Sequence, residues 1–238
     1  MSRNRASTIA TGGAGFTFAD KAAAAFLVQM LQRAFPFGPE LGPVAELHFE
    51  TRESGNLLDD LQLVLHRGSE SFKCTAAVKS NRQLTKAGFN SEFVKDAWEQ
   101  WQGAGGSKFN AATDILCLIA GVVDEQALQA WRELQKQARA TTPERLAERL
   151  ADGNQFSSVQ RAIFKSLQNP QGSSDIETAQ LVARVRLLHF SEDKEGDYIN
   201  WCAEVLLDGI QSEGAKLWSR LLQLASEKQS DRRIFRSC

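Results

Sequence analysis

The stretch Leu57-Leu58-Asp59-Asp60-Leu61-Gln62-Leu63-Val64-Leu65 decides the fold when it is taken with Phe72-Lys73-Cys74-Thr75-Ala76-Ala77-Val78-Lys79-Ser80-Asn81, which follows after a short turn. In both segments apolar residues alternate with other residues. Because side chains of a strand point to opposite faces with a period of two, the alternation predicts two neighbouring strands of a hairpin. We expect Asp60 and Lys79 to share the more polar face, with the leucines packed beneath.

Further elements are expected on both sides of this hairpin. Apolar spacing and turn residues predict strands over 44–51, 114–123 and 183–190, and helices over 16–35, 91–101, 125–140, 143–151, 157–167 and 212–228. Ser91 and Thr142 are the expected caps of two of these helices. The order predicts a flexible N-terminus over 1–14, an α/β core over 15–140, and a mainly helical region over 141–238 that would suit a link to a further domain.

Composition narrows the class of protein. The 238 residues are 42% hydrophobic and 24% charged, which is ordinary for a globular protein. A net charge of -1 argues against a protein that coats nucleic acids, but not against an enzyme that contacts DNA locally. The four cysteines form no CxxC pair, no secretory signal is visible, and the apolar runs are too short to span a bilayer. We therefore expect a cytoplasmic protein without a membrane segment.

An acid beside a lysine on adjacent strands suits phosphate chemistry. Such a pair can hold a divalent metal and position a water next to a phosphate, so Asp60 and Lys79 are the first candidate site residues. The structural alternative is that the Asp-Asp pair serves a turn, because aspartate hydrogen-bonds its own backbone. Lys79 has a structural alternative too, as the solvated end of a strand.

Seven short segments, in their order along the chain, carry a resemblance to a known family. They are Gly12-Gly13-Ala14-Gly15-Phe16, Phe18-Ala19-Asp20, Phe49-Glu50-Thr51-Arg52, Leu58-Asp59-Asp60-Leu61, Val78-Lys79-Ser80-Asn81-Arg82-Gln83, Ala97-Trp98-Glu99-Gln100-Trp101 and Leu187-Leu188-His189-Phe190. The chain resembles the PD-(D/E)xK, or restriction-endonuclease-like, nucleases. More narrowly, it is similar to the DUF4297-like or Mrr-like double-stranded-DNA nuclease domain of bacterial antiphage NTPase proteins.

The resemblance implies a restriction-endonuclease-like core and a Mg²⁺- or Mn²⁺-dependent DNA endonuclease that acts as an antiphage effector. It implies that Asp60 binds the metal, with Asp59 as a second candidate, and that Lys79 orients the attacking water or stabilises charge on the phosphate. Asp20 falls where related nucleases place a helical acid. The residues expected near the DNA backbone follow the second strand: Asn81, Arg82 and Gln83. The resemblance also implies activation by oligomerisation through an attached sensor or NTPase domain.

One position departs from the motif. Ala77 stands where the family has an acid or glutamine two residues before the lysine. Gln62 and Glu50 are the candidate replacements, and Asp20 could also complete the site. If none does so, the chain is a catalytically inactive DNA-binding or protein-interaction and oligomerisation module. RNA is an alternative substrate, because the metal chemistry is the same for either backbone.

Overall fold

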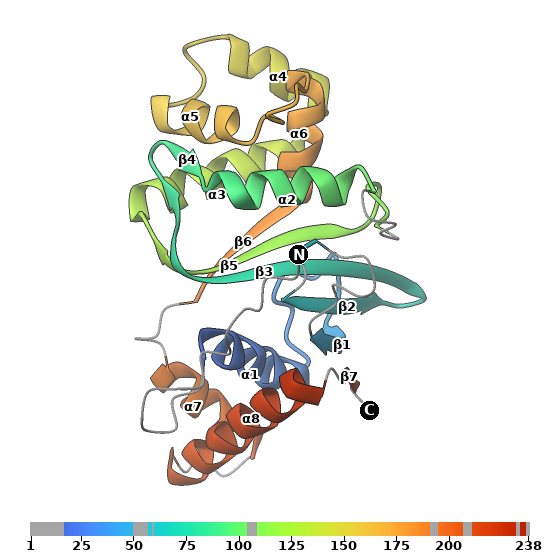
Figure 1. Ribbon diagram of the computed structural model, residues 1–238, viewed down its shortest axis with the longest axis vertical. Helices are drawn as coiled ribbons and strands as arrows, with labels where there is room; N and C mark the ends of the chain where they lie inside the picture. Colours follow the sequence, from blue (N-terminus) through green and yellow to red (C-terminus); the bar gives the residue numbers. More distant parts are fainter. Residues whose placement is uncertain are drawn as a thin grey trace, which may run out of the picture.

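The computed structural model describes residues 17–49, 57–58, 60–103, 109–190, 195–206, 211–231 and 234–236. A seven-stranded mixed sheet runs through the middle, with helices on both faces (Figure 1). This confirms the predicted α/β class with a mixed central sheet flanked by helices. The strands are β1 (Val44–Phe49), β2 (Leu61–Arg67), β3 (Glu70–Thr85), β4 (Gly88–Phe89), β5 (Ile115–Val123), β6 (Val185–His189) and β7 (Ile234–Arg236).

The strand order is β6-β5-β3-β2-β1-β7, and β4 pairs with β3 beside this path. The β5 strand lies parallel to both β3 and β6, whereas β1, β2 and β7 form antiparallel pairs. The predicted hairpin is confirmed. Its turn consists of Gly68 and Ser69, because Arg67 pairs with Glu70. Gly68 has a φ of 60°, a left-handed conformation that glycine adopts without steric cost.

The helices are α1 (Phe18–Leu31), α2 (Ser91–Trp101), α3 (Glu125–Ala140), α4 (Pro143–Ala151), α5 (Ser158–Ser166), α6 (Asp175–Arg184), α7 (Glu195–Val205) and α8 (Gln211–Asp231). Helices α1, α7 and α8 cover one face of the sheet, while α2 to α6 lie on the other side (Figure 1). Helices α6 and α7, and the strands β4 and β7, were not predicted. None of the helices in the described ranges is long and apolar enough to cross a membrane.

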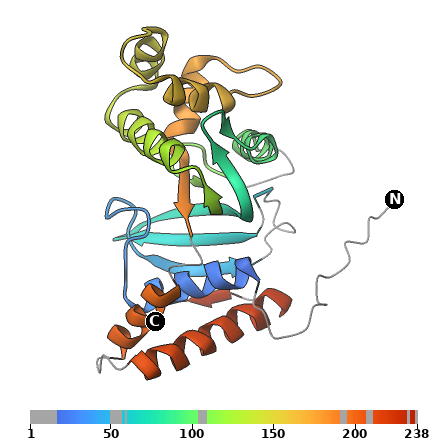
Figure 2. The ribbon, with the colours of Figure 1, turned by 90° about the vertical axis from the view of Figure 1, so that its left-hand side faces the viewer.

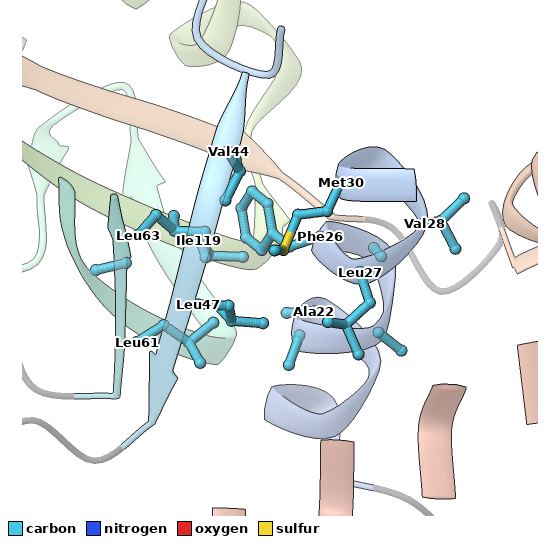
Figure 3. Packing of buried hydrophobic residues seen from close by; sticks show 14 of the residues in the cluster. Ala22, Phe26, Leu27, Val28, Met30, Val44, Leu47, Leu61, Leu63 and Ile119 are labelled. Carbon is cyan, nitrogen blue, oxygen red and sulfur yellow. The ribbon is translucent and has the colours of Figure 1, made fainter. Parts of the chain in front are cut away.

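Helix α1 forms the centre of one core. It begins with a capping box, in which the Thr17 hydroxyl accepts the Asp20 amide and the Asp20 carboxylate accepts the Thr17 amide. Phe26 and Met30 point toward the strands, where they meet Val44 and Leu47 (Figure 3). The helix ends at Leu31, four residues earlier than predicted, because the chain turns through a positive φ at residue 33.

The C-terminal helices complete this layer. Helix α8 lies beside α1 below the sheet (Figure 2). Trp218 of α8 is buried and stacks on Tyr198 of α7, with ring centroids 5.3 Å apart. The short β7 strand adds to the edge at β1, where Arg236 Nε lies 3.0 Å from Glu46 Oε1. Thus the C-terminal region contributes both helices and a strand to the core architecture, and the predicted division at residue 140 stays a prediction.

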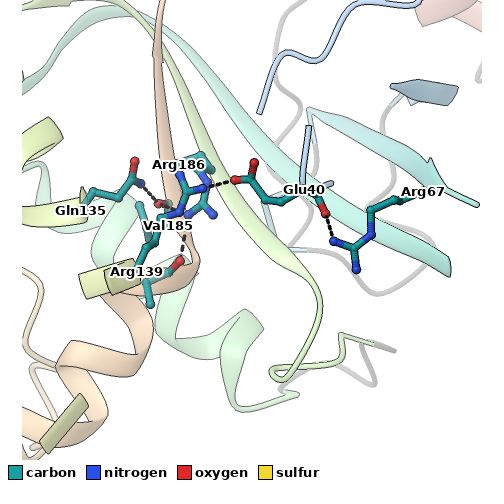
Figure 4. Close-up of polar contacts among 7 residues, drawn as sticks. Glu40, Arg67, Gln135, Arg139, Val185 and Arg186 are labelled. Carbon is teal, nitrogen blue, oxygen red and sulfur yellow. Dashed lines mark hydrogen bonds and ion pairs between the residues drawn. The ribbon is translucent and has the colours of Figure 1, made fainter. Parts of the chain in front are cut away.

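A polar network connects the loop after α1 with helix α3 and strand β2. Glu40 pairs with Arg139 of α3, and its carbonyl accepts Arg67 Nη1 at 2.7 Å (Figure 4). Arg186 of β6 is buried beside this pair and donates to the Ala183 carbonyl at 2.8 Å. Its burial, and then the charge of Arg139, lower the pKa of Arg186 to about 10. Arg186 is thus a buried cation in the edge strand β6, where backbone carbonyls accept its hydrogen bonds.

Candidate functional site

Asp60 and Lys79 come together at one end of the hairpin. Asp60 directly precedes β2, and Lys79 lies in β3. The register pairs Leu61 with Ala76, so Ala77 and Lys79 share the sheet face that packs against α2 and α3. Lys79 Nζ lies 3.8 Å from Asp60 Oδ2, and the side chains are 39% and 35% exposed. The arrangement expected from the alternation of residues is therefore present.

The Asp60 carboxylate also has a structural task. Its Oδ2 accepts the backbone amide of Val78 at 2.7 Å. The described pairing of β2 with β3 starts at Leu61, and the Asp60 side chain accepts an amide of β3 just beyond it. It thereby satisfies a backbone donor of β3. The same oxygen consequently serves both the sheet and the contact with Lys79.

Asp20 is engaged in helix capping. Its Oδ2 accepts both the amide and the hydroxyl of Thr17 at 2.8 Å. Its Oδ1 is buried and has no hydrogen-bond partner in the part of the chain that the structure describes. Helix α1 packs on the face that carries Val78, whereas Lys79 points to the other face. The metal-binding role suggested for Asp20 stays a prediction, and capping already explains the residue.

The other predicted residues differ in their availability to a ligand. Gln62 is half-buried and pairs with Thr75, next to the pair that Leu61 forms with Ala76. Asn81 and Arg82 are exposed beyond Lys79, where the pairing with β5 is irregular. Gln83 is buried, and its Nε2 donates to Asn81 Oδ1 at 2.5 Å. Asn81 and Arg82 can therefore reach a ligand, while Gln83 positions Asn81.

The described side chains do not supply a complete set of ligands for a metal ion. Glu50 and Asp59, which the sequence suggested as metal ligands, lie outside the described residues. Across the described ranges, no three His, Cys, Asp or Glu side chains gather as a metal site. Asp60 is one carboxylate and Ala77 provides none, whereas Mg²⁺ takes octahedral oxygen coordination. The described residues by themselves do not fit the ion, and we derive no step through it.

Two residues of α2 join the site without having been predicted. The Gln100 side chain is fully buried, and its Oε1 accepts the Leu57 amide at 2.7 Å, which holds the segment leading to Asp60. Asp96 has a raised pKa, first because of desolvation and then because of Glu92 and Glu99, while Lys95 and Lys79 oppose the shift. Asp96 is thus within electrostatic reach of Lys79.

A sequence signal for these two residues exists, although it is weak. Asp96 and Gln100 are four residues apart, which places them on one face of a helix. That helix begins after Asn90, whose side chain accepts the Glu92 amide at 2.9 Å. The expected cap, Ser91, is instead the first helical residue. The face that α2 turns toward the sheet depends on packing, which the spacing alone does not specify.

Solved structures of bacterial receptors share this fold. The Acinetobacter baumannii Cap4 SAVED/CARF-domain containing receptor, solved with the cyclic trinucleotide 3'3'3'-cAAA, matches 96% of this chain and 43% of that chain, with a TM-score of 0.56 and 12% identity. The Moraxella osloensis Cap4 SAVED/CARF-domain containing receptor matches 92% and 44%, with a TM-score of 0.52 and 13% identity. No protein-family model and no curated protein matches the sequence. The chain spans less than half the length of these receptors.

These findings correct the family assignment that the sequence suggested. The matching solved structures are described as Cap4 SAVED/CARF-domain containing receptors, not as PD-(D/E)xK nucleases. The prediction that the chain belongs to the PD-(D/E)xK, DUF4297-like or Mrr-like group is therefore wrong. A physical reason lies in the hairpin, where the acid that supported the resemblance has a structural explanation. Asp60 accepts the Val78 amide, and Ala77 leaves the motif without its second acid.

Proposed function

We propose that this chain is a ligand-binding and assembly module of a receptor used in bacterial antiphage defence. The observation that carries the proposal is the fold match, which covers 96% of this chain but only 43% of a receptor solved with a cyclic trinucleotide. A module of this kind works as part of a larger protein or complex. This function agrees with the non-catalytic alternative that the sequence left open, rather than with the effector nuclease.

The ligand class that the site suits is a phosphodiester. Lys79 is half-buried in the second half of β3, and Asn81 and Arg82, which follow it in the same strand, are exposed. Ammonium and guanidinium groups bind phosphate oxygens, and the guanidinium can do so with two parallel hydrogen bonds. A cyclic oligonucleotide and a nucleic acid backbone both present this group. The edge beyond Lys79 is therefore our candidate contact surface.

The test is a titration of the purified chain with the cyclic trinucleotide 3'3'3'-cAAA and, separately, with a double-stranded DNA oligonucleotide. Lys79→Ala and Arg82→Ala are compared with Lys86→Ala, an exposed lysine of the following turn. Binding that the first two changes weaken and the third does not would support the proposal. Equal effects of all three would indicate nonspecific attraction, and no binding of either ligand would refute the role of this edge.

Metal-dependent hydrolysis of DNA phosphodiesters, an endodeoxyribonuclease activity, is our second candidate. The contact of 3.8 Å between Lys79 Nζ and Asp60 Oδ2 favours it, because a lysine beside an acid can stabilise charge on a phosphate. The assay is cleavage of a supercoiled plasmid with Mg²⁺ or Mn²⁺ over a series of protein concentrations, with an RNA substrate in parallel. Cutting that Asp60→Asn and Lys79→Ala both abolish would support hydrolysis, and a well-folded chain that never cuts would contradict it.

Self-association belongs to the same proposal. The sequence suggested a homo-oligomer or an association with an NTPase or sensor domain, and the chain matches 43% of the Acinetobacter baumannii receptor. Light scattering of the chain with and without 3'3'3'-cAAA measures this. A ligand-dependent increase in mass would support assembly, while an unchanged monomer would assign the ligand response to another part of the receptor.

A further inference from the structure

The pairing of β3 with β5 is irregular within the candidate contact surface beyond Lys79. The register shifts between Lys79 and Arg82 and again between Arg82 and Leu84, and in both places β3 has one residue more than β5. Such β-bulges change the direction in which the side chains of a strand point, and they are common beside functional sites. Ser80, Asn81 and Arg82, in and next to the first bulge, are all exposed. The irregular pairing therefore presents consecutive side chains to solvent.

Contacts with two neighbouring segments hold this part of β3 in place. Gly121 of β5 lies so close that an added Cβ would be 2.7 Å from the Ser80 carbonyl oxygen. A glycine in a strand often marks such a close approach of two backbones. On the other side, the Gln83 carbonyl accepts the amide of Asn90, the residue that caps α2, at 2.9 Å. The backbone around Asn81 is thus held on both sides, so its side chain leaves the sheet from a defined position.

The amide group of Asn81 has a defined orientation. Gln83 is 5% exposed, and its Nε2 donates to Asn81 Oδ1 at 2.5 Å. An asparagine side chain has a carbonyl oxygen that accepts hydrogen bonds and an NH₂ group that donates them. Turning the Asn81 amide alone by half a turn would bring its NH₂ group against that of Gln83, where neither group can accept. Because the oxygen faces the buried glutamine, the Nδ2 donors of the exposed Asn81 are the part of the amide left for a ligand.

We propose that Gln83 is a positioning residue, which turns the Asn81 amide so that its N–H groups donate to a phosphate oxygen of the ligand. The charged oxygens of a phosphodiester only accept hydrogen bonds, so the reverse orientation of the amide would set oxygen against oxygen. The inference rests on the proposed function, because it assigns a further donor to the same surface as Lys79 and Arg82. Asn81 differs from these two residues in being uncharged, so its contribution should depend little on salt.

The test is a titration of the full chain with 3'3'3'-cAAA and with a double-stranded DNA oligonucleotide, arranged as a double-mutant cycle. Asn81→Ala should weaken binding about tenfold or more, which is the effect of a hydrogen bond to a charged group. Gln83→Met removes the donor and keeps a long side chain. It should weaken binding about two- to tenfold, because the Asn81 amide then loses its fixed orientation. In the Asn81→Ala background, Gln83→Met should have no further effect, since Gln83 acts only through Asn81.

Salt dependence and a matched control separate this contact from other effects. For DNA, Arg82→Ala should reduce the slope of log K against log salt concentration by about one, whereas Asn81→Ala should lower the affinity equally at all salt concentrations. Gln160→Met is the matched control, because Gln160 is another buried glutamine with a hydrogen-bonded side chain, but it lies in α5. This variant should bind both probes as the wild type does.

The outcomes distinguish the positioning role from the proposed function. If the wild type binds neither probe, both fail. If the wild type binds and Asn81→Ala keeps its affinity, the positioning role is overturned, while the proposed function stands on Lys79 and Arg82. If the losses of Asn81→Ala and Gln83→Met add, or if Gln160→Met loses as much, Gln83 acts through the fold and its positioning role is again overturned.

Circular dichroism establishes that each variant is folded. If Gln83→Met is not, NMR of the wild type decides instead. The Asn81 Nδ2 protons should shift more than the Gln83 Nε2 protons when the probe that binds is added, and the opposite order would overturn the proposal.

Discussion

Replacing Asp60 with alanine should destabilise the fold even when no ligand is present. Oδ2 of Asp60 accepts the Val78 amide at 2.7 Å, and Val78 is 9% exposed. In Asp60→Ala this amide loses its partner in a position where water reaches it poorly. Leaving a buried backbone donor unsatisfied costs about 1–3 kcal/mol. We therefore expect Asp60→Ala to lower the free energy of unfolding by that amount.

Two companion variants separate the hydrogen bond from the ion pair. Lys79→Ala removes the cation that lies 3.8 Å from Asp60, but both side chains are more than a third exposed, and such pairs contribute about 0–1 kcal/mol. Asp60→Asn keeps a carbonyl oxygen that can accept the Val78 amide. It should cost about 1 kcal/mol or less, since only the charge of the acceptor is lost.

Urea unfolding followed by tryptophan fluorescence measures the free energy of unfolding of the three variants. An unchanged m-value shows that these free energies are comparable. Hydrogen exchange at the Val78 amide provides a local readout, which should accelerate in Asp60→Ala and stay protected in Lys79→Ala. If Asp60→Ala and Lys79→Ala were equally stable, or if Val78 exchange did not change, the ladder role of Asp60 would be refuted.

Three further predictions concern backbone, charge and thiol chemistry. Gly42→Ala should lower the free energy of unfolding by about 2 kcal/mol or more, because a Cβ there would lie 1.9 Å from a carbonyl of β2. At Gly68 an added Cβ meets nothing within 4 Å, so Gly68→Ala should lower it by about 1–2 kcal/mol from the positive φ alone. Equal losses in urea unfolding would contradict this. The raised pKa of Asp96 means that the folded state binds its proton more tightly, so this group destabilises the protein above its folded pKa, and the penalty fades as the pH falls toward the unfolded value. Asp96→Asn should therefore be more stable than the wild type at pH 7 but not at pH 3, as thermal unfolding at both pH values would reveal. Burial, and then the hydrogen bond with Cys117, raise the pKa of Cys74 well above its usual value, so it should resist iodoacetamide at pH 8 until urea unfolds the chain; rapid labelling of the native protein would disprove this.

The parts of the fold that local sequence encodes were predicted closely. Helices α3 and α4 occupy the predicted ranges, because Asp124 and Thr142 cap them and Pro143 suits a first turn. The hairpin followed from residue alternation and from its glycine turn. Helix α6 was missed although it has a capping box at Ser174 and Glu177, a signal that was present in the sequence.

Other features depend on contacts between distant segments. The three-residue strand β7 forms only because the edge of β1 is available to pair with it, and Ile234–Arg236 has no strand pattern of its own. Strand β3 runs to Thr85, four residues beyond the predicted end, because β5 and β4 pair with its far half. Such pairings are set by tertiary packing, which a period-two pattern does not report.

The candidate site shows the same division between what is local and what is not. The alternation of residues predicted that Asp60 and Lys79 would meet, because a strand has a fixed period. It did not predict that Asp60 completes the ladder at Val78, since that depends on where the paired part of β2 begins. Nor did it predict Asp96, whose approach to Lys79 depends on how α2 crosses the sheet.

The double use of Asp60 decides how its function has to be tested. An alanine at this position removes the amide acceptor, the partner of Lys79 and any ligand contact together, so lost activity in Asp60→Ala would not separate a binding role from a structural one. Asp60→Asn keeps the acceptor and removes the charge. If this variant keeps its stability but loses affinity for a phosphodiester or loses cleavage, the carboxylate acts on the ligand. If it keeps both, Lys79 and Arg82 alone account for the contact, and the acid at the start of β2 belongs to the sheet.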